Sequence, residues 1–128
     1  MRIFLDTTVL VDAIRGQGTA ERLRALLRRN VQPFVCAINV EELWRGARGT
    51  AAERKLADVL LGLYVVPLGA EEGELAGRWR REFAAKGRAL SQGDCLIAAA
   101  AVRIDAPLAT ANVKDFPMKE LIVEDWTA

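Results

Sequence analysis

Two spacings of apolar residues alternate along this chain. Short, nearly continuous apolar runs are separated by longer segments in which apolar residues recur every three or four positions. The short runs predict β-strands over residues 2–5, 33–37, 63–67, 106–109 and 121–123. The longer segments predict helices between residues 7 and 16 and over 20–29, 39–46, 51–61, 70–86 and 91–103. Strands that alternate with helices favour an α/β fold of three layers, α/β/α, with a central parallel sheet of four to five strands.

Hydroxyl and amide side chains stand where several of these helices should begin. Thr7 or Thr8 can cap the first helix, Asn39 a later one and Ser91 the last. The turn at residues 17–19 offers a further cap. No repeat, linker or low-complexity tract interrupts the pattern, so we expect residues 1–128 to form a single domain.

Composition and charge narrow the classes of protein. Of the 128 residues, 52% are hydrophobic and 27% are charged, which is typical of a folded domain and not of a disordered segment. The 18 basic and 17 acidic residues nearly cancel, so any surface that binds a polyanion must be local. The longest apolar run, residues 95–102, is too short to span a membrane, and no signal peptide is recognisable. We therefore expect a cytoplasmic protein without membrane contact.

Cysteine and histidine usage excludes one class of metal site. Cys36 and Cys95 stand in apolar runs, so we expect them to be buried, reduced thiols. The chain has no histidine. Two isolated cysteines without histidine cannot build a structural zinc site.

Four acidic residues stand beside the carboxyl ends of the predicted strands. Asp6 follows the first strand, and Glu42 lies in the helix after the second. Asp94 lies in the first turn of the last helix, and Asp115 follows the fourth strand. In an open parallel sheet, ligands bind in the crevice at this edge. Carboxylates gathered there repel one another, and Mg²⁺ or Mn²⁺, which prefer oxygen ligands, would offset the repulsion.

Each acid also has a local explanation. Asp6 could cap a helix, Asp115 could end a turn, and Glu42 and Asp94 each lie three residues after a predicted cap, the spacing of a capping box. Capping does not explain why all four fall at one edge of the sheet, which favours the joint site. Of the two neighbouring glutamates Glu41 and Glu42, the spacing from the cap and the leucine that follows favour Glu42.

Four segments that carry these acids resemble a PIN-domain ribonuclease of the VapC type, the toxin of a type II toxin–antitoxin pair. They are LDTTVLVD at 5–12, INVEELWRGA at 38–47, LSQGDCLIAA at 90–99 and LATANVKDF at 108–116. Each motif alone is weak, whereas all four in this order and at this chain length are specific. One departure is Thr8, where the family more often has serine or asparagine.

The resemblance implies a PIN-like domain that is a metal-dependent endoribonuclease. Its metal ligands, which are also the catalytic residues, correspond to Asp6, Glu42, Asp94 and Asp115. Supporting positions correspond to Thr7, Thr110 and Asn112. The last acidic position of the family is its most variable, so Asn112 is an alternative to Asp115 beside the metal. The resemblance further implies a Mg²⁺ or Mn²⁺ cofactor, a transfer or ribosomal RNA substrate, a cognate VapB-like antitoxin and a homodimer.

The chemistry that follows is hydrolysis of an RNA phosphodiester by metal-activated water, which leaves a 5′-phosphate and a 3′-hydroxyl. Without histidine, the chain has no imidazole acid–base pair of the kind that metal-free ribonucleases use. The alternative is a catalytically inactive PIN module that binds RNA or a protein partner. A phosphatase of the haloacid dehalogenase type would need a second aspartate where Thr8 stands.

Two further groups of residues are candidates for contact surfaces. Basic residues that flank the acidic segments and could contact phosphates are Arg15, Arg45, Arg48, Lys86, Arg88 and Lys114. Apolar residues that could form core, an antitoxin groove or a homodimer face are Trp44, Leu56, Leu60, Leu61 and Leu63. For the basic residues, solvated helix ends are the plainer interpretation.

Overall fold

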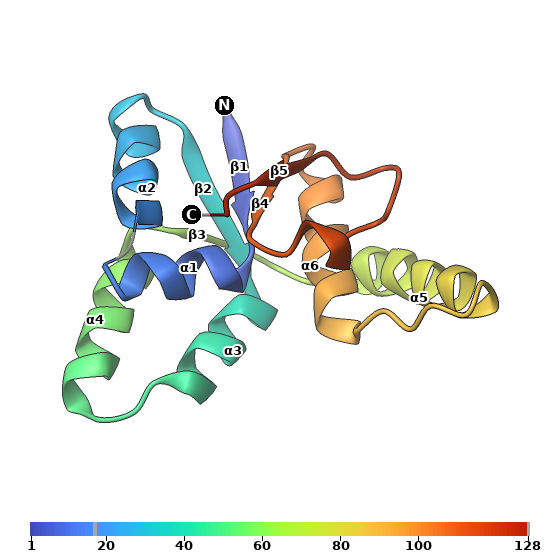
Figure 1. The fold of residues 1–128 in the computed structure, drawn as a ribbon, viewed down its shortest axis with the longest axis horizontal. Coiled ribbons are helices and arrows are strands. Elements are labelled where there is room, and N and C mark those ends of the chain that lie inside the picture. The colour runs from blue at the N-terminus through green and yellow to red at the C-terminus, as the bar shows by residue number, and fades with distance from the viewer. Residues whose placement is uncertain (17, 128) are drawn as a thin grey trace.

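A five-stranded parallel sheet forms the centre of the molecule (Figure 1). The computed structural model describes residues 1–16 and 18–127. The strands are β1 (Arg2–Leu5), β2 (Gln32–Cys36), β3 (Tyr64–Val66), β4 (Leu108–Thr110) and β5 (Val123–Asp125). They stand in the order β3-β2-β1-β4-β5, so the chain begins at the centre of the sheet and extends it first to one edge and then to the other.

Helices cover both faces of this sheet. They are α1 (Thr7–Ile14), α2 (Gly18–Arg28), α3 (Ala37–Gly46), α4 (Thr50–Leu61), α5 (Ala70–Ala85), α6 (Gln92–Arg103) and the short 3-10 helix η1 (Val113–Asp115). In Figure 1, α1, α2 and α4 lie on one side of the sheet and α5 and α6 on the other. The expected three-layer α/β/α fold with a parallel sheet is therefore confirmed.

Alternate residues of β1 pack into two separate hydrophobic clusters. Phe4 is fully buried with Trp79 of α5 and the alanine-rich face of α6. Ile3 and Leu5 point to the opposite face and pack with residues of α1, α2 and α4, among them Leu10. Burial of each such side chain contributes roughly 1.5–3 kcal/mol. Because both faces of β1 are covered, its sequence is a continuous apolar run without alternation.

Two strands are displaced from their predicted positions. The fourth begins at Leu108 and not at residue 106, because Pro107 has no amide hydrogen to donate to a neighbouring strand. The last covers Val123–Asp125 and not residues 121–123. Glu124 and Asp125 are exposed, since β5 is an edge strand, and their polarity hid the strand from the apolar pattern.

The caps of helices α1 and α3 differ from those that the sequence predicted. Asp6 caps α1 by accepting a hydrogen bond from the Thr7 amide at 2.9 Å, so Thr7 and Thr8 lie inside the helix. The α3 helix begins at Ala37, which places Asn39 in its first turn. Asn39 is therefore not the N-cap that was predicted; its side chain instead accepts from the backbone amide of Cys36, which occupies the N-cap position.

Without a cap at Asn39, no capping box can include Glu42. Ser91 does cap α6, and its hydroxyl accepts from the Asp94 amide at 3.1 Å. The predicted turn at residues 17–19 begins at Gln17, which lies outside the described residues, while Gly18 and Thr19 open α2.

Both cysteines are free and buried, as expected. Burial raises the pKa of the Cys36 thiol and raises that of Cys95 to about 11, so both thiols are protonated at neutral pH. Within residues 1–16 and 18–127, each helix is too short or too polar to cross a membrane.

Candidate active site

A pocket of about 480 Å³ opens at the carboxyl edge of the sheet. It is lined by Asp6, Thr7, Thr8, Val11, Asp12, Glu42, Arg45, Asp94, Ala111, Asn112 and Asp115. All four acidic residues singled out in the sequence line this one pocket. They reach it from the end of β1, from α3, from the first turn of α6 and from η1.

Asp6 is held in place by three hydrogen bonds. Its Oδ1 accepts from the Thr7 amide, and its Oδ2 accepts from the hydroxyls of Thr8 at 2.9 Å and Thr110 at 2.8 Å. Asp6 is only 4% exposed, and Thr110 at the end of β4 is fully buried. These donors fix the direction of the Asp6 carboxylate at the floor of the pocket.

Glu42 reaches the pocket from α3. Its Oε1 accepts from the Thr7 hydroxyl at 2.6 Å. The neighbouring Glu41 does not line the pocket and instead forms two hydrogen bonds of 2.8 Å with Arg45, one turn further along the helix. The side chain of Arg45 lines the pocket, and it is the one cation among its lining residues.

Asp94 is half-buried at the start of α6. Its pKa is raised from 3.8 to about 6, chiefly by burial and also by the negative charges of Asp6, Asp115 and Glu42, while the Ser91 hydroxyl acts in the opposite direction. The three other acids are therefore close enough for their charges to disfavour ionisation of Asp94. Negative charge accumulates in the pocket, which favours a bound cation.

The loop after β4 brings Asn112 and Asp115 to the pocket rim. The backbone amide of Asn112 donates to the Thr110 hydroxyl at 2.9 Å, which joins the loop to the floor of the pocket. The Arg88 guanidinium donates to the Lys114 carbonyl and so joins η1 to the segment that precedes α6. Both candidates for the last ligand position, Asn112 and Asp115, thus line the pocket.

In their present arrangement, no three Asp, Glu or Cys side chains within residues 1–16 and 18–127 converge closely enough to hold a metal ion. The donor chemistry nevertheless fits a hard divalent cation, because the pocket offers carboxylate, amide and hydroxyl oxygens. The half-buried Asp94 is a second indication of fit, since a cation would offset both the burial and the neighbouring negative charges that raise its pKa.

Two lining residues escaped the sequence reasoning. Asp12 is a fifth acid, one helical turn after Thr8 on α1, and the i, i+4 spacing was the available signal. Thr8 was considered as a helix cap and as a departure from the family pattern but not as a site residue, yet its hydroxyl donates to Asp6 and accepts from the Ala111 amide at 3.2 Å.

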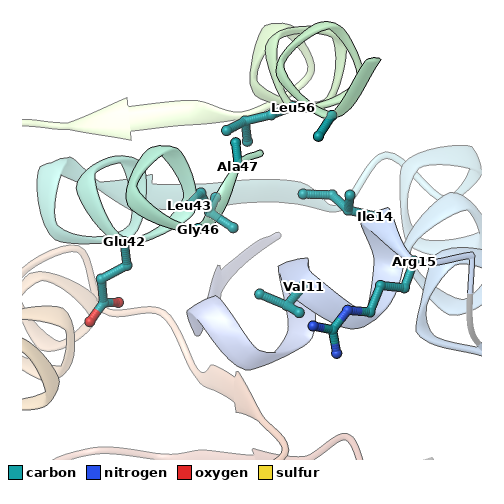
Figure 2. Close-up of a pocket in the computed structure, with 9 residues that line it drawn as sticks. Val11, Ile14, Arg15, Glu42, Leu43, Gly46, Ala47 and Leu56 are labelled. Carbon is teal, nitrogen blue, oxygen red and sulfur yellow. The ribbon is translucent and has the colours of Figure 1, made fainter. Parts of the chain in front are cut away.

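Beside the acidic pocket lies an apolar groove between α1, α3 and α4, with a volume of about 190 Å³. Its lining residues are Val11, Ile14, Arg15, Glu42, Leu43, Gly46, Ala47, Ala52 and Leu56. Figure 2 shows the Glu42 carboxylate turned away from these apolar side chains. Glu42 and Val11 line both cavities, so the groove runs directly into the acidic pocket.

The other candidate contact residues are divided between core and surface. Leu56 is buried, whereas Leu61 is 87% exposed and Trp44 is 41% exposed. Of the basic residues, Arg45 alone lines the acidic pocket, and Arg15 lines the groove.

Comparison with known proteins assigns the family. The model of the PIN domain matches residues 3–117. This chain belongs to the PIN-domain family. Its relatives include Ribonuclease VapC19 of Mycobacterium tuberculosis, which is 34% identical over 116 residues that cover 89% of this chain and 91% of the relative. The resemblance to VapC-type PIN domains seen in the four motifs is thereby confirmed.

The fold of this PIN domain is also similar to that of solved VapBC structures. VapBC2 from Rickettsia felis, bound to a DNA fragment from their promoter, superimposes with a TM-score of 0.87 and 29% identity, covering 98% of this chain and 99% of that one. VapBC-1 from nontypeable Haemophilus influenzae superimposes with a TM-score of 0.84 and 27% identity over the full length of both chains.

Proposed function

We propose that this PIN domain is a metal-dependent endoribonuclease toxin of the VapC type, which a cognate VapB-like antitoxin neutralises. The observation that carries the proposal is the gathering of four carboxylates around one pocket, where burial and mutual repulsion raise the pKa of Asp94 to about 6. The relatives named ribonucleases support RNA as the substrate. The intact acidic set favours the enzyme over a PIN module that only binds RNA or protein.

The residues that would hold Mg²⁺ or Mn²⁺ are Asp6, Glu42, Asp94 and Asp115, with Asn112 as the alternative to the last. A divalent cation bound there would supply positive charge that neutralises an RNA phosphate and acidifies a water molecule for attack. Both ions suit this all-oxygen donor set.

Other side chains of the pocket would orient the carboxylates and contact the RNA. The hydroxyls of Thr8 and Thr110 orient the Asp6 carboxylate. The Thr7 hydroxyl does the same for Glu42. Arg45, held at the rim by Glu41, is placed to contact the phosphate backbone of an incoming RNA.

Substitution of Asp6 and of Asp94 tests the catalytic proposal. We expect Asp6→Asn and Asp94→Asn each to lower RNA cleavage by at least about a hundredfold, because each removes a charge that binds the cation. Cleavage of a labelled RNA should be measured with Mg²⁺, with Mn²⁺ and with EDTA, and circular dichroism should verify folding. As a matched control, the exposed Asp58→Asn should leave cleavage unchanged. Full cleavage by folded protein in EDTA would contradict the proposal.

The apolar groove is our candidate for the antitoxin contact. It adjoins the acidic pocket through Glu42 and Val11, so a bound segment that extends past these residues would also block RNA. The VapBC complexes among the solved structures support a partner of this kind. The exposed Leu61 and Trp44 are left for the expected homodimer, which stays a prediction.

A further inference from the structure

The hydroxyl of Thr7 stands in the middle of a hydrogen-bond chain that ends on the Glu42 carboxylate. Asn39 Nδ2 donates to Thr7 Oγ1 at 3.1 Å, and Thr7 Oγ1 donates to Glu42 Oε1 at 2.6 Å. A hydroxyl has a single hydrogen, and an amide nitrogen can only donate. Because Thr7 Oγ1 accepts from Asn39, its own hydrogen is left for Glu42.

The orientation of the Asn39 amide is fixed by groups that cannot exchange roles. Its Oδ1 accepts from the Cys36 backbone amide at 2.8 Å, and its Nδ2 donates to the Leu5 carbonyl at 3.1 Å. A flipped amide would place two donors together at Cys36 and two acceptors together at Leu5. Asn39 is 0% exposed, so water cannot replace these partners. The direction of the chain from Asn39 to Thr7 to Glu42 therefore follows from the backbone.

A purely structural Asn39 would need only its two backbone bonds, which join the end of β1 to the start of α3. The second hydrogen of Nδ2 is instead directed at Thr7, whose side chain lines the acidic pocket. That bond links a fully buried residue to the pocket.

On its other side, Glu42 lies against the first turn of α6. A Cβ at Gly93 would come within 3.4 Å of Glu42 Oε2, so this oxygen sits beside the backbone that carries Asp94. One carboxylate oxygen is thus tethered by Thr7, and the other faces the helix of the neighbouring acid. Both contacts together restrict where the carboxylate can lie.

We propose that Asn39 is a positioning residue that acts through the Thr7 hydroxyl to hold the Glu42 carboxylate for cation binding. The inference rests on the proposed metal site and adds a residue that does not touch the cation. Partners that orient metal ligands typically change metal affinity by about 10–100-fold when they are removed.

The first test is the affinity for Mn²⁺ alone, measured by isothermal titration calorimetry. We expect Thr7→Val to lower it by about 10–100-fold, because valine has the shape of threonine without the hydroxyl. Thr7→Ser keeps the hydroxyl and should restore affinity to within about threefold of the wild type. Thr50→Val, at an exposed position at the start of α4, is the matched control and should have no effect.

The second test asks whether Asn39 acts through Thr7. Asn39→Ser removes the amide donor and should lower Mn²⁺ affinity, whereas in a Thr7→Val background it should lower it no further, within about twofold. Losses that multiply in the double variant would overturn the proposal. If Asn39→Ser does not fold, the comparison of Thr7→Val with Thr7→Ser still decides the role of the hydroxyl.

A metal-free measurement separates this inference from the proposed function. NMR relaxation of the Glu42 side chain should show greater mobility in Thr7→Val than in the wild type or in Thr7→Ser. Unchanged mobility, or Mn²⁺ affinity that is lost in Glu42→Gln and retained in Thr7→Val, would overturn the positioning role alone. If Glu42→Gln keeps full Mn²⁺ affinity, the metal role proposed for Glu42 is wrong, and with it the positioning of that carboxylate for a cation.

Discussion

Asp94 is the residue whose charge the fold disfavours. It is half-buried, and four other carboxylates line the same pocket, three of which raise its pKa. Its position in the first turn of α6 offsets only part of this cost, because the helix N-terminus contributes only about 0.3–1 kcal/mol to a nearby negative charge. The raised pKa therefore records an electrostatic strain that the fold retains at the site.

The strain predicts a pH dependence of stability in metal-free protein. The folded-state pKa of Asp94 is about 6, above its ordinary value of 3.8, so between these values the native state binds more protons than the unfolded state. Stability should therefore fall as pH rises from 4 to 6. In Asp94→Asn this contribution is absent, so the variant should be more stable than the wild type above pH 6 and not near pH 4. Urea unfolding in EDTA across this range measures the effect, and parallel curves for both proteins would contradict it.

The first turns of α6 and α3 position side chains at or beside the acidic pocket. α6 begins with Ser91 bonded to the Asp94 amide, so the cap and the candidate ligand belong to one turn. α3 begins with a different device, in which Asn39 turns back to the Cys36 amide. Local spacing identified the first start and missed the second, because an asparagine three residues before a glutamate looks like a cap whether or not the helix has already begun.

Removal of the α6 cap should cost stability. We expect Ser91→Ala to lower the free energy of unfolding by about 1 kcal/mol, because the Asp94 amide loses its acceptor. For a domain of this size, that loss corresponds to a fall in melting temperature of roughly 3–5 °C. Thr50→Ala is the control, since Thr50 lies inside α4 and Gly49 occupies the cap position. Equal melting temperatures for Ser91→Ala and the wild type would rule out a stabilising cap.

The acidic pocket and the adjoining groove differ in character, one acidic and the other apolar. The acidic pocket lies at the carboxyl edge of the sheet, and the groove continues from it between α1, α3 and α4. An antitoxin segment in the groove would need apolar side chains to fill it and would reach the acidic pocket at Glu42. Our proposal therefore places RNA cleavage and antitoxin binding on adjoining surfaces.

A charge placed in the groove should separate inhibition from cleavage. We expect Ala52→Glu to weaken binding of the cognate antitoxin by at least about tenfold, because an apolar segment would bury an unpaired carboxylate. RNA cleavage by the free variant should be unchanged. The neighbouring Ala51→Glu is the control, since Ala51 is exposed and lies outside the groove. Biolayer interferometry measures the affinity, and equal affinities for the two variants would exclude the groove as the contact.

The sequence predicted the succession of strands and helices along the chain. It also predicted that the sheet is parallel and that the acids lie at its carboxyl edge. Each depends on periodicity or on the position of a residue relative to the nearest strand, and both are local properties of the chain. Glu42 was preferred to Glu41 partly because of a cap expected at Asn39; the helix begins earlier, although Glu42 does line the pocket.

Hydrogen-bond partners that lie far apart along the chain could be identified only from the tertiary structure. The order β3-β2-β1-β4-β5 places β4 beside β1, and this alone brings the Thr110 hydroxyl to Asp6, 104 positions away. Asn39, expected as a cap, is buried in the structure and forms hydrogen bonds with Leu5, Thr7 and Cys36. Such contacts depend on which elements pack together, and apolar spacing along a strand or helix contains no information about its neighbours.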